Sequence, residues 1–162
     1  MLNINEIVDS AENQCRKRGV RLTKKRKMVL ECLLRNGKPT SAYSIVDYFK
    51  DRLNEHIPAM SVYRILKFLQ NNLLVHKIQT QNKFIVCSHI ACDHDHQTTQ
   101  ILICQKCNRV EEVLSSTIFN QELQKNLERT KFQLFTSQFE INCICISCHT
   151  EYKNKKITSL GH

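Results

Sequence analysis

The first half of the chain places apolar residues at helical spacing in four successive segments. The pattern predicts a leading helix that ends near Gly19 and three more helices that begin after Thr23, Ser41 and Pro58. Thr23 and Ser41 are good N-cap residues, and proline suits the start of a helix. Around residues 80–82, the segments LLVHKIQ and KFIVCS predict two short strands in a hairpin. Four helices followed by a hairpin indicate a winged helix-turn-helix.

The second half combines short strands with one helix. QILIC, RVEEV and the long alternating segment KFQLFTSQFEINCIC predict three strands. Between the second and third of them, Ser115 or Ser116 caps a helix through STIFNQELQKNLER. We expect these elements to form a small α+β sheet whose edge is shared with a second copy of the chain.

Charge divides the chain in the same place. Residues 1–80 carry 15 Lys and Arg against 7 Asp and Glu, whereas residues 81–162 carry 9 against 8. A basic domain suits a polyanion such as DNA, although a solvated basic surface is the alternative. No run approaches the roughly 18 to 20 apolar residues of a membrane helix, and the N-terminus lacks the features of a signal peptide. We therefore expect a cytoplasmic protein with no membrane partner.

The fourth helix carries the residues expected to contact double-stranded DNA. Arg64 suits the O6 and N7 acceptors of guanine, while Ser61 and Tyr63 suit phosphate or the thymine methyl group. Lys67 shares this face, and Arg26 in the second helix is a further predicted contact. An ordinary solvated helix face is the alternative, but the helix order, the wing and the charge together favour DNA binding.

The nine cysteines indicate metal binding rather than disulfides, because a reducing compartment keeps thiols free. Cys104 and Cys107 form one CxxC pair, and Cys145 and Cys148 form another, with 37 residues between the pairs. Four thiolates at this spacing can close a tetrahedral structural zinc site with no open position. A thiol-redox role is the weaker alternative, since it needs only one CxxC at a helix start. Cys15 and Cys32 are predicted core residues.

The remaining ligand-type side chains predict a second metal site. His76 lies in the first wing strand, Cys87 follows the second, and the loop 92–96 and the pair Glu111 and Glu112 come later. Thiolate, imidazole and carboxylate together suit Zn²⁺, whereas an all-N/O site suits iron or manganese. The alternatives are a buried structural cysteine and a surface histidine. A third, weaker site or a solvated loop would account for the surplus residues, which are Cys92, His89, His94 and Cys143.

These observations predict an α+β chain, with an N-terminal winged helix-turn-helix domain followed by a small α/β dimerisation domain with zinc knuckles. The predicted winged-helix DNA-binding domain covers residues 1–88. A metal-binding hinge loop covers 89–99, the α+β dimerisation and metal-binding domain covers 100–155, and a tail covers 156–162. A dimer would present two recognition helices to a pseudo-palindromic operator.

Several segments resemble the ferric uptake regulator superfamily, over nearly the whole chain: LTKKR, SVYRILKFL, VHK, LICQKC and CISC. The pattern of His76, Cys87, a loop histidine and Glu112 is similar to its zinc uptake regulator branch. The resemblance implies a homodimeric repressor that shuts off zinc-import genes when zinc-loaded. It also implies two zinc ions per chain. The structural ion would be held by Cys104, Cys107, Cys145 and Cys148. The regulatory ion would be held by His76, Cys87, His96 and Glu112, with His94 and Glu111 as alternates.

The sequence departs from the family pattern at one larger place and at a few smaller ones, which include Ser61 in place of the usual threonine. Thr98, Thr99 and Gln100 stand where iron-type members carry a His-Asp-His run, which disfavours iron and peroxide sensing. Asn108 replaces a glycine and tolerates the left-handed conformation, and Cys143 stands where a small residue is common. An iron, manganese or peroxide regulator is the alternative within the family. A zinc-handling protein, a thiol-redox protein or a zinc hydrolase would leave the basic winged helix unexplained, so we expect no enzyme.

Overall fold

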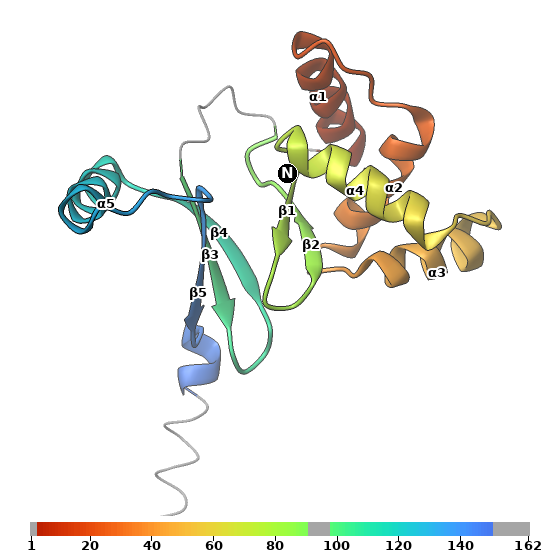
Figure 1. The fold of residues 1–162 in the computed structure, drawn as a ribbon. Coiled ribbons are helices and arrows are strands. Elements are labelled where there is room, and N and C mark those ends of the chain that lie inside the picture. The colour runs from red at the N-terminus through yellow and green to blue at the C-terminus, as the bar shows by residue number, and fades with distance from the viewer. Residues whose placement is uncertain (1–2, 91–97, 151–162) are drawn as a thin grey trace, which may run out of the picture. The chain divides into compact units, whose positions relative to one another are not determined.

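The computed structural model describes residues 3–90 and 98–150, and the chain forms two compact units, Met1–Asp95 and His96–His162 (Figure 1). The helices are α1 (Ile4–Lys17), α2 (Lys24–Asn36), α3 (Ala42–Leu53), α4 (Ala59–Asn71) and α5 (Thr117–Thr130). The strands are β1 (Val75–Ile78), β2 (Lys83–Val86), β3 (Thr99–Cys104), β4 (Val110–Leu114) and β5 (Gln138–Cys143). Within the described residues, no helix has the length and hydropathy of a membrane span.

The predicted helix boundaries of the first unit follow from local capping. Asn3 and Glu6 form a reciprocal capping box at the start of α1, and the Ser41 side chain accepts from the Ser44 N–H at the start of α3. Gly37 ends α2 with a φ of 61°, a left-handed conformation that glycine adopts at low cost. Thr23 occupies the predicted N-cap position of α2, although its side chain makes no capping hydrogen bond.

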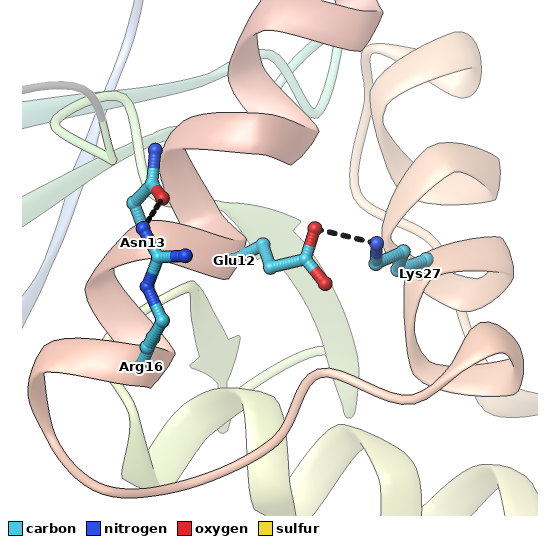
Figure 2. Close-up of polar contacts among 4 residues, drawn as sticks. All are labelled: Glu12, Asn13, Arg16 and Lys27. Atoms are coloured by element: carbon cyan, nitrogen blue, oxygen red, sulfur yellow. Dashed lines mark hydrogen bonds and ion pairs between the residues drawn. The ribbon is translucent and has the colours of Figure 1, made fainter.

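The apolar faces of the four helices meet in one core. Its largest fully buried side chains come from α2, α3, α4 and the start of the hairpin: Val29, Leu30, Ile45, Phe49, Val62, Leu66, Leu69, Leu74 and Val75. α1 is joined to α2 by an ion pair in which Lys27 Nζ lies 2.6 Å from Glu12 Oε2, and Arg16 donates to Asn13 within α1 (Figure 2). Cys15 and Cys32 are buried in this core, as the sequence predicts.

The wing is the antiparallel pair β1 and β2, in which Val75 is paired with Val86 and Ile78 with Lys83. Asn82 takes a φ of 50° in the turn between them. The segment before α3 also joins this hairpin, because Thr40 and Phe84 exchange two backbone hydrogen bonds of 3.0 and 2.8 Å. The sequence gives no periodic signal for that third strand segment.

The second unit holds a three-stranded sheet of order β4-β3-β5, with β3 antiparallel to β4 and parallel to β5. Ser116 caps α5 by accepting from the Phe119 N–H. The prediction of one long strand over KFQLFTSQFEINCIC is wrong, since β5 covers only Gln138–Cys143. Lys131 ends α5 at a φ of 60°, and β3 begins at Thr99, which is opposite Gln138 and donates its N–H to the Ser137 carbonyl, so residues 131–136 have no described strand partner.

Candidate metal centres and nucleic-acid interface

The four cysteines of the two CxxC pairs converge at one end of the second unit. Cys104 ends β3, Cys107 lies in the following turn, Cys145 lies just after β5, and Cys148 lies in a short helical turn over 146–150. Their sulfur atoms all lie within 4.8 Å of one another. The Sγ atoms of Cys107 and Cys145 are 3.7 Å apart. A single ion with four thiolate ligands fits this spacing.

The turn that carries Cys107 depends on its left-handed residue. Asn108 has a φ of 58°, and its N–H donates to the Cys104 carbonyl over 3.0 Å. The Cys104 N–H in turn donates to the Arg109 carbonyl over 2.9 Å. The tolerance of asparagine for this conformation, expected from the sequence, keeps the knuckle turn intact.

The electrostatics of the cluster favour a divalent cation. The backbone N–H groups of Cys145, Cys107 and Lys106 donate to the Cys104 sulfur and lower its pKa to about 6. Hydrogen bonding among the crowded thiols, led by Cys145 and Cys107, raises the pKa of Cys148 to about 12. The sulfurs therefore cannot all ionise beside one another without a positive charge between them. A zinc ion would supply that charge and hold all four as thiolates, so the residues present fit it.

A second pair of ligand-type side chains lies on the wing. Cys87 follows β2 and donates its N–H to the Leu74 carbonyl over 3.0 Å, while His76 is paired with Ile85. This register places His76 and Cys87 diagonally on one face of the hairpin, and their ligand atoms lie within 4.8 Å of each other. Both are buried, with exposed fractions of 8% and 2%. The structure thus brings together two of the four residues predicted for the regulatory site.

The other predicted ligands fall in the second unit and in the loop before it. Glu112 lies half-buried on β4, whereas Glu111 is exposed and forms an ion pair of 3.1 Å with Arg109. His96 and its alternate His94 lie outside the described residues, as does Cys92. Cys143 ends β5 opposite Cys104 but does not belong to the four-sulfur cluster. The eight cysteines within the described residues are all free thiols.

The predicted DNA-contacting residues lie on α4 and α2. Arg64 and Lys67 are exposed, and Ser61 and Tyr63 are half-buried. The Tyr63 ring meets Tyr43 edge-on, with centroids 6.4 Å apart, and Tyr43 is 65% exposed. The sequence gives no signal for this contact between Tyr43 and Tyr63, because it depends on the packing of α3 against α4.

Arg26, the predicted contact on α2, already has partners inside the first unit. Its guanidinium carbon lies 3.4 Å from the centroid of the Phe68 ring on α4. Its Nη1 donates to the Arg21 carbonyl over 2.6 Å. Arg26 therefore ties α2 to α4 by a cation–π contact, and a contact between Arg26 and DNA stays a prediction.

Comparison with known proteins decides the family. The sequence model of the ferric uptake regulator family matches residues 17–142. The chain belongs to the ferric uptake regulator family. The zinc uptake regulation protein of Escherichia coli (strain K12) is 29% identical over 144 residues, which cover 88% of this chain and 81% of that protein. The same protein of Shigella flexneri matches equally.

Solved structures of the family agree with this assignment. A zinc uptake regulator complexed with zinc and DNA has a TM-score of 0.81 at 25% identity, covering 94% of this chain and 99% of that one. The crystal structure of holo XcZur has a TM-score of 0.76 at 30% identity, covering 90% and 99%. The predicted fold class, a winged helix-turn-helix followed by a small α+β domain with a cysteine cluster, is confirmed. Membership in a family of regulators also confirms the expectation of a regulator rather than an enzyme.

Proposed function

We propose that the chain is a zinc-responsive transcriptional repressor that binds a palindromic operator as a zinc-loaded dimer and represses zinc-uptake genes. The observation that carries the proposal is the buried His76 and Cys87 pair on the wing of a winged helix. A metal ligand pair in that position belongs to the same compact unit as the helix predicted to contact DNA. Similar proteins are zinc uptake regulators, and one of them is complexed with zinc and DNA. They support zinc as the metal and DNA as the partner of this chain. A repressor of this kind acts in the cytoplasm.

Two zinc ions per chain are proposed, one structural and one regulatory. The structural ion is held by Cys104, Cys107, Cys145 and Cys148, which leave no coordination position for a substrate or for water. Such a closed site stabilises the second unit rather than reporting on the free zinc level.

The proposed regulatory ion is held by His76, Cys87, His96 and Glu112. Glu112 is preferred to its alternate Glu111 because Glu112 is half-buried on β4, whereas Glu111 is exposed. His94 stays the alternate to His96. A soft thiolate beside imidazole favours zinc over iron or manganese, which prefer nitrogen and oxygen ligands.

This proposed site also gives the metal a route to DNA affinity. Its ligands come from the wing, from the hinge loop over 89–99 and from the domain over 100–155. Zinc binding would therefore select one orientation of the recognition helices. Because the coupling is reciprocal, operator DNA would raise the affinity for regulatory zinc by the same factor.

A homodimer would cover apolar surface that the single chain leaves exposed. Ile118 on α5, Phe132, Phe135 and Ile146 in the second unit are between 71% and 103% exposed. Large apolar side chains gathered in one small domain usually mark an interface. The dimer would present Arg64 and Lys67 twice, once to each half-site, with Ser61, Tyr63 and Arg26 as the further proposed contacts.

The test is operator-fragment binding by fluorescence anisotropy, with buffered free zinc and then with iron(II) and manganese(II), the structural zinc being kept in place. We expect tight, salt-sensitive binding with zinc alone. Cys87→Ser should abolish the zinc response, whereas the matched variant Cys143→Ser should keep it. An equal response to iron would move the chain to the iron-sensing part of the family. No DNA binding with any metal would favour a zinc-handling protein instead.

A further inference from the structure

A cavity of about 500 Å³ lies between α2 and α3 in the first unit. Its lining shares no residue with the two metal centres or with the predicted DNA contacts. Ser44, Tyr48 and Arg52 line it from α3, where a spacing of four residues places them on one helix face. Cys32 and Arg35 line it from α2 at a spacing of three. Asn36 at the end of α2 and Thr40 in the segment between the helices complete the lining, so the cavity is built mainly by α2 and α3.

The lining is cationic and has no internal counter-ion. None of the residues that line the cavity is acidic. Arg35 and Arg52 are exposed. Within residues 3–90 and 98–150, neither guanidinium group forms a hydrogen bond or an ion pair. Cys32 is only 3% exposed, and burial raises its pKa to about 11, so the thiol adds no negative charge at neutral pH. Two guanidinium groups are therefore available to one anionic ligand.

The side chains that accompany the arginines suit a phosphate group. Each guanidinium presents N–H donors in a planar fork that matches phosphate oxygens. The hydroxyl groups of Ser44 and Tyr48 add neutral donors, and the half-buried Tyr48 ring offers an apolar wall. Two positive charges balance a phosphate monoester, which carries close to two negative charges at pH 7.

The size and shape of the cavity favour a small molecule. A volume of about 500 Å³ lies within the range of ligand pockets and exceeds what an inorganic phosphate ion fills. We propose that this cavity binds a small phosphate monoester, with Arg35 and Arg52 on the phosphate and Tyr48 against the organic part. The site is independent of the metal response, so either can fail without the other.

The first experiment is isothermal titration calorimetry on the full chain with glycerol 3-phosphate, inorganic phosphate and glycerol as probes. Saturable binding of glycerol 3-phosphate, weaker binding of inorganic phosphate and none of glycerol are expected. Binding should weaken as the pH falls through about 6, where the monoester becomes a monoanion. Absence of saturable binding by the phosphate probes, or binding that ignores this pH range, would overturn the proposal.

Variants locate the site. Arg35→Ala and Arg52→Ala should each weaken binding about tenfold or more, since each loses charge-assisted hydrogen bonds. Lys50→Ala removes an exposed cation of α3 that does not line the cavity, and it should leave binding unchanged. Arg52→Lys keeps the positive charge but loses the planar pair of N–H donors, so its affinity should be intermediate. This variant replaces Arg52→Ala in the test if the alanine variant does not fold. Retained affinity in both arginine variants would overturn the assignment.

A last arm separates the small molecule from the DNA backbone, the other source of phosphate oxygens. The double variant Arg35→Ala/Arg52→Ala is titrated with operator DNA in the anisotropy assay. Unchanged DNA affinity supports a site for a free phosphate monoester. A large loss of DNA affinity, together with no binding of glycerol 3-phosphate to the unaltered chain, would assign the cavity to a DNA phosphate and refute the proposal.

Discussion

Cys148→Ser removes one of the four sulfurs on which the second unit depends. The described part of that unit contains four buried side chains, all on β3: Thr99, Ile101, Ile103 and Cys104. α5 contributes none, and the aromatic side chains of Phe132 and Phe135 are exposed. An apolar core this small cannot hold three strands and a helix in place by itself.

The size of the effect follows from that core. Full burial of an isoleucine side chain contributes about 3 kcal/mol at most, and only Ile101 and Ile103 contribute on that scale. A structural zinc ion contributes about 10 to 16 kcal/mol to the folding of a small metal-dependent domain. Within a single chain the metal is therefore the larger stabilising contribution, and its loss should unfold the sheet of the undimerised chain rather than loosen it.

Hydrogen exchange measured by NMR tests this separately for the two units. In Cys148→Ser, and in the unaltered chain stripped of zinc by a chelator, the amides of Ile101 and Ile103 should lose protection. The amides of Leu66 and Leu69 in α4 should keep theirs, because the core of the first unit contains no metal ligand except His76 and Cys87 at its edge. Cys143→Ser is the matched control and should leave both units protected. Protected β3 amides after complete removal of zinc would refute the reasoning.

Three further outcomes test the first unit. Burial raises the pKa of Cys32 from about 9 to about 11, so the folded chain holds this proton more tightly, and stability should fall by up to about 2 to 3 kcal/mol between these pH values. The difference between the free energies of unfolding of the unaltered chain and of Cys32→Ala, measured against pH, isolates this fall. A difference that does not change with pH would contradict the prediction. A double-mutant cycle on Glu12 and Lys27 should give a coupling of about 0.5 to 1 kcal/mol that shrinks with added salt. Gly37→Ala should lower the free energy of unfolding, measured in urea, by about 1 kcal/mol. The cost comes only from the left-handed backbone at this position, since nothing lies within 4 Å of the added Cβ.

The helices of the first unit could be predicted from sequence because their signals are local. Ser41 caps α3, Pro58 precedes α4 and Gly37 ends α2, and each acts within one turn of its own position. The two CxxC pairs could be predicted for the same reason, because each pair is defined by its own short spacing. Their convergence requires only that the ends of two neighbouring strands lie together. The pairing of Thr40 with Phe84 could not be predicted, because it depends on where the completed core places the segment before α3.

The second unit was harder to predict because alternation alone does not make a strand. Residues 131–134 alternate as residues 138–143 do, but Phe135 follows Leu134 directly and breaks the period, and the paired strand begins only at Gln138. The parallel direction of β5 follows from the crossing made by α5, which no local pattern records. The proximity of two predicted regulatory ligands is likewise a tertiary property: the register of the hairpin places His76 beside Cys87, although eleven positions separate them in sequence.

The two units therefore differ in what stabilises them, and this difference suits a metal regulator. The first unit buries a continuous apolar core, so the fold of the helix predicted to contact DNA does not depend on the four-sulfur cluster. The second unit has a minimal core, a four-sulfur cluster and exposed apolar side chains, so its order depends on ligands and on self-association. The structural ion would therefore decide whether the second unit is folded. The proposed regulatory ion acts through His76 and Cys87 on the wing, so it can select an orientation of the first unit without unfolding its recognition helix.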